Sequence, residues 1–328
     1  MTADPTVLTP EQVRRDRARA GAVRALLDVY SNFGGVLSPD GTRVLFHSDR
    51  GGVPELFVAE VAHPEREAIR LVAGPERVGS AFFLPDGKTV LFRRDSGADE
   101  NFHILRIGVD GRGLTDLTPG PAMWRDTPLV PRDRPDRMIF SARTHTDYAS
   151  KILVQPLSPG EAKVVYRDPG PGTAVDVSPD GGRALWIREV STGGHELLEV
   201  DLESGRARMV SPQGGRPGDV SAAAYSADGS RILVATDGGG ERQALWALDR
   251  ATLALAAEYL QAAPATARVT AVVPSPRGDR VAILIDAGNR STVRLLDAAT
   301  LVPRTEVATP PGTVTLGIAT EVRFPLGA

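Results

Sequence analysis

The sequence predicts an all-β fold, a β-propeller of four-stranded blades with six complete blades and the first strand of a seventh, preceded by an N-terminal α-helix. Three observations predict it: a recurring turn motif, a near-constant spacing between its copies, and the same order of strands and turns after each copy. The copies are marked by positions 39, 85, 131, 179, 227 and 276, at intervals of 46, 46, 48, 48 and 49 residues. A fixed period in this range is typical of a solenoid, a propeller or an array.

Residues 1–32 lie outside the repeat, and their sequence predicts a helical arm. Thr9 is a capping residue, Pro10 suits the first helical position, and Gln12 completes a capping box, so a helix is expected to run from here to about Tyr30. Its many arginines admit two interpretations, an arm that docks on another domain or a polyanion, and a solvated helix face. The second is favoured because three acidic residues dilute the basic charge. These are Glu11, Asp16 and Asp28.

Each repeat has the internal order of a propeller blade. A short apolar run ends at a turn such as Ser178-Pro179-Asp180-Gly181, where proline presets one φ angle and glycine accepts a left-handed one. An apolar, β-branched run follows, as in residues 231–236, and predicts a buried second strand. A turn rich in glycine and acid leads to a third strand, and a shorter, more polar fourth strand ends the unit. Four strands in a repeat of this length indicate a blade.

The propeller is expected to cover residues 33–328, with blades starting near 33, 79, 125, 173, 219 and 268, and a partial seventh from 313. Residues 313–320 have the character of an innermost strand. If they begin a seventh blade, three strands are missing and unpaired edges remain. The favoured interpretation is therefore truncation of a larger protein; the alternative is a six-bladed ring with residues 313–324 as an accessory strand.

Composition narrows the class of protein. The chain is 41% hydrophobic, and turns account for its 34 glycines and 26 prolines. A net charge of −3 gives no reason to expect nucleic acid or an anionic membrane as a partner. The absence of cysteine excludes disulfides and agrees with a reducing compartment. With no apolar run long enough to span a membrane and no secretory signal, the expected location is the cytoplasm.

No motif in the sequence carries catalysis. A Gly-x-Ser-x-Gly nucleophile elbow, a phosphate-binding loop and a dinucleotide-binding motif are all missing, so no catalytic residue is predicted. The five histidines lie in different repeats without metal-ligand spacing, and residues 95–101 match a calcium loop only in part because Arg106 stands where its glutamate would be. No metal and no cofactor is expected. The histidines are His47, His63, His103, His145 and His195.

The repeats also carry a resemblance to known families. The pattern Ser-Pro-Asp-Gly-x-Arg, followed by an apolar strand and an acidic glycine turn, resembles the TolB-type propeller repeat. Residues 92–104 (FRRDSGADENFHI), with 114–118 (LTDLT), resemble the second blade of the amino-terminal propeller in prolyl oligopeptidase family serine peptidases of the acylaminoacyl-peptidase or dipeptidyl aminopeptidase type. The resemblance covers nearly the whole chain from Phe33 onward.

The resemblance implies a seven-bladed propeller followed by an α/β-hydrolase domain with a Ser-Asp-His triad, the propeller admitting peptides and excluding folded proteins. The sequence given departs from that pattern because it ends before a hydrolase begins. Activity is therefore not expected of this chain alone, whereas the parent protein is expected to be a serine-type peptidase. The expected partners are an α/β-hydrolase domain, in cis or in a longer parent chain, and a peptide substrate. The alternative is a free-standing TolB-like propeller that binds a protein or a peptide, since fold does not determine function.

Topology predicts where the functional face lies. Strands alternate in direction, so the turns after the second strands lie on the same side as the links that enter the blades, and a downstream domain is expected there. Asp99 and Glu100 are candidates to hold a substrate ammonium by charge-assisted hydrogen bonds. The favoured alternative is that such acidic turn residues bind backbone amides. The candidates facing substrate or hydrolase are Asp95, Asp99, Glu100, His195, Arg242 and Arg290 in turns, and Arg125, Asp126 and Asp219 near the links.

Overall fold

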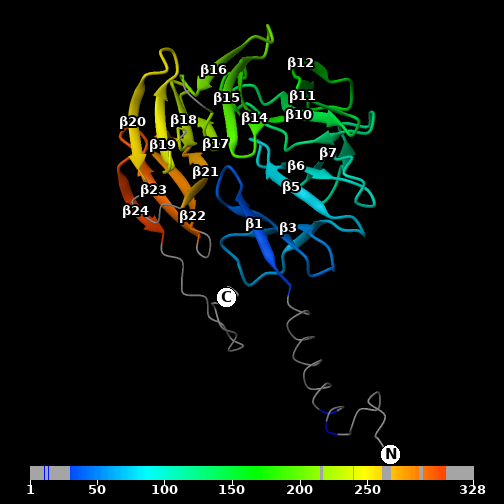
Figure 1. The fold of residues 1–328 in the computed structure, drawn as a ribbon. Coiled ribbons are helices and arrows are strands. Elements are labelled where there is room, and N and C mark those ends of the chain that lie inside the picture. The colour runs from blue at the N-terminus through cyan, green and yellow to red at the C-terminus, as the bar shows by residue number, and fades with distance from the viewer. Residues whose placement is uncertain are drawn as a thin grey trace, which may run out of the picture. The chain divides into compact units, whose positions relative to one another are not determined.

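The computed structural model describes residues 11, 14, 30–214, 217–238, 240–260, 267–287 and 291–307. Within these residues, 24 strands form six four-stranded sheets (Figure 1), which confirms the prediction of six four-stranded blades. The predicted helix lies outside the described residues except for Glu11, Arg14 and Tyr30, and the predicted strand of a seventh blade lies outside them entirely. In the described part, no helix is long and apolar enough to cross a membrane.

The chain divides into two compact units, Met1–Pro128 with Pro156–Glu161, and Leu129–Gln155 with Ala162–Ala328. The first unit contains two complete antiparallel sheets, in the orders β1-β2-β3-β4 and β5-β6-β7-β8. Its strands are β1 (Asn32–Leu37), β2 (Arg43–Ser48), β3 (Glu55–Glu60), β4 (Ile69–Val72), β5 (Val78–Phe83), β6 (Thr89–Arg94), β7 (His103–Gly108), β8 (Thr115–Asp116) and β9 (Trp124–Arg125).

The second unit contains the strands from β10 onward, and three of its sheets again follow chain order, from β13 to β16, β17 to β20 and β21 to β24. Its strands are β10 (Arg137–Thr144), β11 (Asp147–Pro156), β12 (Lys163–Asp168), β13 (Gly172–Val177), β14 (Arg183–Ser191), β15 (Gly194–Asp201), β16 (Ala207–Ser211), β17 (Val220–Tyr225), β18 (Arg231–Thr236), β19 (Ala244–Asp249), β20 (Leu255–Leu260), β21 (Arg268–Pro274), β22 (Arg280–Asp286), β23 (Ser291–Asp297) and β24 (Pro303–Val307).

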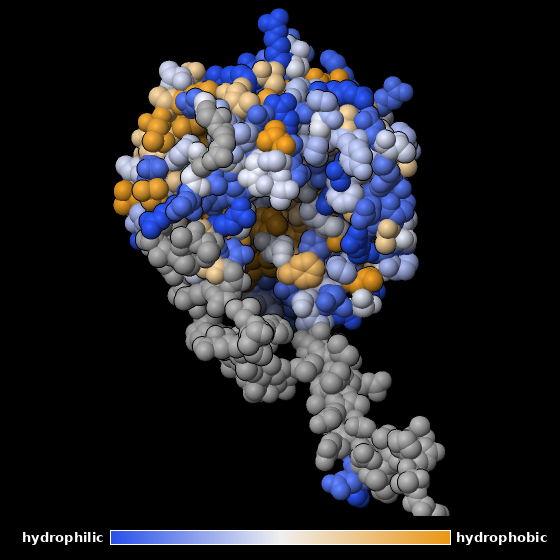
Figure 2. Space-filling model, in the orientation of Figure 1, coloured by the Kyte–Doolittle hydropathy of each residue, from blue (hydrophilic) through white to orange (hydrophobic). Residues whose placement is uncertain are grey.

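The core of the second unit lies between neighbouring blades. Strand β18 is apolar on both faces because both faces are covered: Val234 packs in one cluster with Leu185 of β14, and Leu233 in another with Ile283 of β22. A strand buried on both faces has a continuous apolar run instead of an alternating pattern. The outer strand β20 is different, because Leu255 and Leu260 remain exposed. Figure 2 shows hydrophobic side chains at the left edge of the view, where β20 is labelled in Figure 1.

The turn between the first two strands of a blade explains the repeated motif. Ser178 Oγ donates to Asp180 Oδ1 at 2.5 Å, and Gly182 N donates to the same oxygen at 2.9 Å. Gly181 has a φ of +71°, and a Cβ added there would lie only 3.0 Å from Pro131 of the preceding turn. The glycine is thus required both by its left-handed conformation and by the proline packed against it.

Candidate functional site

The turn between β6 and β7, residues 95–102, has an unusual backbone. Gly97, Ala98 and Glu100 adopt left-handed φ angles of 61°, 57° and 59°. An L-amino acid in this region is disfavoured by about 1 kcal/mol or more, so two such residues in one short turn persist only where other contacts hold them. Strained backbone of this kind is concentrated at functional sites, which makes this turn a candidate.

Two carboxylates hold the turn, and a third is free. Asp95, buried at the start, accepts the Glu100 N–H at 3.2 Å. Asp99 accepts the side-chain amide and the backbone N–H of Asn101, each at 3.0 Å, and these bonds lower the pKa of Asp99. By contrast, the exposed Glu100 carboxylate makes no hydrogen bond or ion pair within the described residues. Of the two candidates for a substrate ammonium, only Glu100 has an unoccupied carboxylate.

The buried carboxylate of Asp95 is only half satisfied. Its Oδ2 lies 3.6 Å from Arg77 Nη2, whereas its Oδ1 is buried and has no hydrogen-bond partner. Most buried polar atoms in proteins are hydrogen-bonded, so an unpartnered oxygen of this kind marks a place where an added donor would be stabilised.

The link that enters the next blade lies against this turn. Arg125 is buried and donates from Nη1 to the Phe102 carbonyl at 3.0 Å and from Nη2 to the Pro121 carbonyl at 2.9 Å. Burial lowers the pKa of Arg125. Trp124 donates to Asp126 Oδ1 at 3.2 Å, and its ring meets that of Phe102 edge to face, with centroids 5.1 Å apart. The structure therefore brings together Asp95, Asp99, Glu100, Arg125 and Asp126 within the first unit.

Arg93 belongs to the same cluster, although it was not among the candidates predicted from the sequence. Its guanidinium lies 4.6 Å over the Phe102 ring and donates to the Arg125 carbonyl at 2.5 Å. Burial lowers the pKa of Arg93, and Asp126 at 4.0 Å opposes that shift. One signal was available: Arg93 lies two residues before Asp95, and such residues share one face of a strand.

In the second unit, His195 and Asp219 form a polar network. His195 Nδ1 lies 3.2 Å from Asp219 Oδ1, while Asp219 Oδ2 accepts hydrogen bonds from Arg268 and, at 3.1 Å, from Gln243 Nε2. Gln243 Oε1 in turn accepts the Val269 N–H at 2.6 Å. These bonds connect the starts of β17 and β21. The side chains of His195 and Asp219 therefore already take part in contacts between neighbouring blades.

The two remaining candidates are Arg242 and Arg290. Arg242 is exposed and makes no hydrogen bond or ion pair within the described residues, and Arg290 lies outside them. Across the described part of the chain, no group of three or more histidine, aspartate or glutamate residues is placed to hold a metal ion. The arrangement in the first unit is suited to binding a cationic group through Glu100.

Comparison with known proteins shows that the chain is similar in sequence to a dipeptidyl aminopeptidase. No family model matches the chain. Dipeptidyl aminopeptidase BIII of Pseudoxanthomonas mexicana is 23% identical over 228 residues, which cover 66% of this chain and 31% of that protein. The chain thus spans about a third of the length of this curated relative.

Several solved structures share the fold. A prolyl endopeptidase aligns with a TM-score of 0.65 and 18% identity, over 92% of this chain and 49% of that one. An oligogalacturonate lyase in complex with manganese gives 0.68 and 12%, over 84% and 77%. A putative TolB from Agrobacterium tumefaciens gives 0.56 and 17%, over 74% and 85%.

Fold and comparisons together define the class of protein, a β-propeller with six four-stranded blades in its described part. More particularly, the chain is similar in sequence to a dipeptidyl aminopeptidase and shares its fold with part of a prolyl endopeptidase. These similarities confirm the predicted resemblance of the chain to a dipeptidyl aminopeptidase, to prolyl oligopeptidases and to the TolB propeller.

Proposed function

We propose that this chain is the non-catalytic, substrate-gating propeller of an oligopeptide-hydrolysing serine peptidase whose α/β-hydrolase domain belongs to a longer parent chain. The proposal is supported by the lengths of the matched proteins, because this chain aligns with only 31% of the dipeptidyl aminopeptidase and 49% of the prolyl endopeptidase. It is also supported by the absence of a nucleophile motif from the sequence given.

The observation that carries the proposal is the free carboxylate of Glu100. It stands on a turn whose backbone is held by Asp95 and Asp99, and it has no partner within the described residues. The ammonium group of a peptide would form charge-assisted hydrogen bonds with it. Asp99 has a supporting role in this proposal, because Asn101 already occupies its carboxylate.

The position of the turn suits contact with a second domain. The buried Arg125 anchors the link of residues 124–127 to the Phe102 carbonyl, so the turn and the link form one surface of the first unit. We place the hydrolase domain on this side, where a peptide amino group held by Glu100 would be presented to it.

The test uses the full-length parent enzyme with Glu100→Gln, and Glu67→Gln as the matched control, because Glu67 is an exposed glutamate in another turn of the same unit. Loss of one charge-assisted hydrogen bond is expected to lower kcat/KM for peptides with a free amino terminus by about tenfold or more. For N-acetylated peptides, kcat/KM should change little in either variant. An unchanged preference for free amino termini in Glu100→Gln would contradict the proposal.

A second assay tests the gating role. The purified chain is mixed with a separately produced hydrolase domain and assayed on chromogenic aminoacyl and acyl-peptide substrates. We expect no turnover by the chain alone and altered selectivity in the mixture. Turnover by the chain alone would mean that it carries a nucleophile and would overturn the assignment.

The alternative function is a free-standing propeller that binds a protein or a peptide. It is favoured by one observation: the similarity to TolB and to the lyase extends over 85% and 77% of those chains, so these relatives are not much longer than this one. The coding sequence downstream of Ala328 distinguishes the two. A strand followed by Gly-x-Ser-x-Gly supports the peptidase, and a stop codon supports the free-standing propeller.

A further inference from the structure

The turn motif departs from its pattern at two blades in the same way. The residue after the proline position is an aspartate in four blades and an arginine in the other two. The aspartates are Asp40, Asp86, Asp180 and Asp228, and the arginines are Arg132 and Arg277.

Each of the four aspartates accepts hydrogen bonds within its own turn. Each accepts the N–H of the residue two positions further on, at 2.8 to 3.0 Å. Asp228, for example, also accepts hydrogen bonds from the Ser226 and Ser230 hydroxyls, and its pKa is lowered to about 2. A carboxylate bound in this way stabilises the turn and has little capacity left for a ligand.

The two arginines do not stabilise their turns in this way, because a guanidinium cannot accept a hydrogen bond. In the turn between β21 and β22, Asp279 takes over, accepting a hydrogen bond from Ser275 Oγ at 2.8 Å. The exposed Arg277 guanidinium consequently makes no hydrogen bond or ion pair within the described residues. Arg132 donates from Nη2 to the Ala227 carbonyl at 2.6 Å and from Nε to Asp133 at 3.3 Å. A guanidinium has five N–H donors, so Arg132 keeps several of them available.

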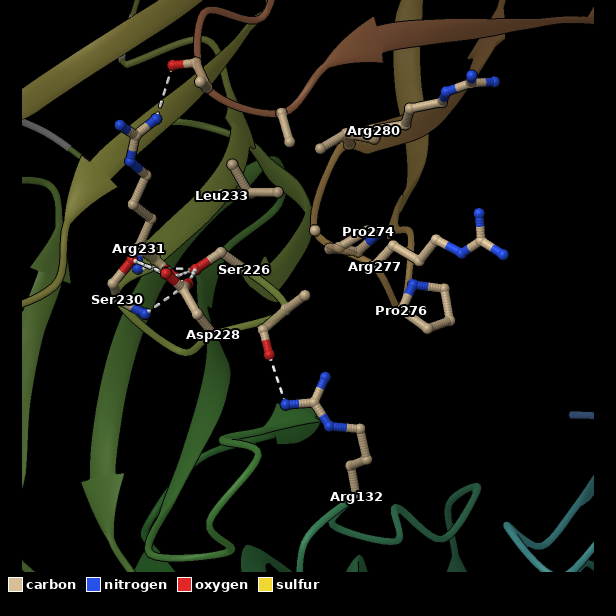
Figure 3. A pocket seen from close by; sticks show the side chains of 15 residues that line it. Arg132, Ser226, Asp228, Ser230, Arg231, Leu233, Pro274, Pro276, Arg277 and Arg280 are labelled. Atoms are coloured by element: carbon tan, nitrogen blue, oxygen red, sulfur yellow. Dashed lines mark hydrogen bonds between the residues drawn. The ribbon is translucent and has the colours of Figure 1, made fainter.

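Both arginines line one pocket, although they lie far apart in the sequence. The pocket has a volume of about 650 Å³ and lies in the second unit, between the turn joining β17 to β18 and the turn joining β21 to β22. Figure 3 shows Ser226 and Asp228 on one side, Pro276 and Arg277 on the other, and Arg132 below them. This is the end of the sheets opposite to Asp219, which precedes β17.

A sequence change explains the space. Elsewhere in the second unit, the proline of one turn packs on the glycine of the next, with Pro179 only 3.1 Å from the Cβ that a residue at Gly229 would carry. The next turn has Ala227 in place of proline, and its Cβ lies 3.4 Å from the corresponding point at Gly278. Alanine lacks the two further ring carbons, so the pocket opens where this packing is reduced.

The residues that line the pocket carry a net positive charge. Four arginines line it, the other two being Arg231 and Arg280, against the single carboxylate of Asp228. Arg231 donates to the Ala299 carbonyl at 2.7 Å. Arg280 lies 3.4 Å from Asp279, but both side chains are more than half exposed, and such surface pairs contribute little.

We propose that this pocket binds the side-chain carboxylates of an acidic oligopeptide, with Arg277 and Arg132 as the principal donors. The planar guanidinium matches a carboxylate through two parallel hydrogen bonds. Leu233, Pro274 and Pro276 add an apolar wall, which suits the aliphatic part of a peptide better than a bare inorganic anion. The choice of a peptide rests on the proposed function, whereas the preference for an anion rests on the pocket alone.

The test is calorimetric titration of the chain with Ac-Glu-Glu-Leu-NH2 and with Ac-Gln-Gln-Leu-NH2, whose blocked ends leave side-chain carboxylates as the sole difference. We expect binding of the acidic peptide only, weakening as NaCl rises from about 50 mM to about 500 mM. Arg277→Gln and Arg132→Gln should each weaken it by roughly tenfold. Arg112→Gln, which removes an exposed charge from the first unit, should leave it unchanged.

Three outcomes would overturn the site: equal affinity for both peptides, no effect of Arg277→Gln, or the same weakening in Arg112→Gln. Tighter binding of trigalacturonate than of the acidic peptide would retain the anion site and reject the peptide. Circular dichroism melting curves establish that the variants are folded. Because this titration reads binding by the chain alone and the Glu100 assay reads turnover by the parent enzyme, each can fail without the other.

Discussion

Tyr225 donates its hydroxyl proton to Glu199 Oε1 at 3.0 Å, joining β17 of one blade to β15 of the blade before it. The same carboxylate receives Arg250 Nε at 2.7 Å and Arg208 Nε at 2.7 Å. Burial raises the pKa of Glu199, but the hydrogen bond and charge of Arg250 outweigh burial, so the net pKa is lowered. This carboxylate therefore stabilises the fold above the ordinary pKa of glutamate, and that stability is lost as the pH falls.

From this network we predict unequal effects on the free energy of unfolding. Tyr225→Phe removes one hydrogen bond and should cost about 1 kcal/mol. Glu199→Gln leaves two arginines without their counter-charge and should cost about 3 kcal/mol or more. Urea denaturation of both single variants and the double variant measures this, and the double variant should cost less than the sum of the singles. Strict additivity would contradict a shared network.

A second prediction concerns the packing of proline on glycine. Gly181 and Gly193 both have left-handed φ angles, 71° and 76°, but only a Cβ at Gly181 would meet a neighbour, Pro131 at 3.0 Å, while nothing lies within 4 Å at Gly193. Gly193→Ala should therefore cost about 1 kcal/mol from conformation alone. Gly181→Ala should cost clearly more, because the two turns must also move apart. Equal losses in urea denaturation would show that the contact with Pro131 contributes nothing.

The repeat was predictable because its turns are determined locally. The hydrogen bonds of Asp180 reach only Ser178 and Gly182, so neighbouring residue types are enough to recognise the turn and the spacing of its copies. The strands were recognisable for a similar reason, since their apolar runs reflect burial on both faces. Those features gave the number of blades and their four-stranded form.

The candidate site was predictable only in outline. Position in a turn placed Asp99 and Glu100 together, but the sequence did not distinguish the carboxylate bound to Asn101 from the free one, because that depends on the backbone angles of the turn. The buried Arg125 side chain donates to the Phe102 carbonyl, and this partner lies 23 positions away in sequence. Likewise, comparing the turns shows that Arg132 and Arg277 replace aspartates, whereas their meeting in one pocket requires the fold.

The last prediction is a pH dependence from Asp176. Burial raises its pKa to about 6, although hydrogen bonds from the N–H groups of Tyr225 at 2.7 Å and Val177 at 2.8 Å oppose the shift. Because the folded state then binds a proton more tightly than the unfolded state, stability should fall as the pH rises from about 4 to about 6 and stay lower above that range.

Asp176→Asn removes the charge and keeps an oxygen that accepts a backbone N–H. We expect it to stabilise the protein by about 1 kcal/mol at about pH 7.5 and to have little effect at about pH 4, where the native carboxyl is already protonated. Urea denaturation of both proteins at the two pH values measures this. A gain of the same size at both values would show that the variant acts through packing, and a loss at about pH 7.5 would show that the ionised carboxylate is favourable at this position.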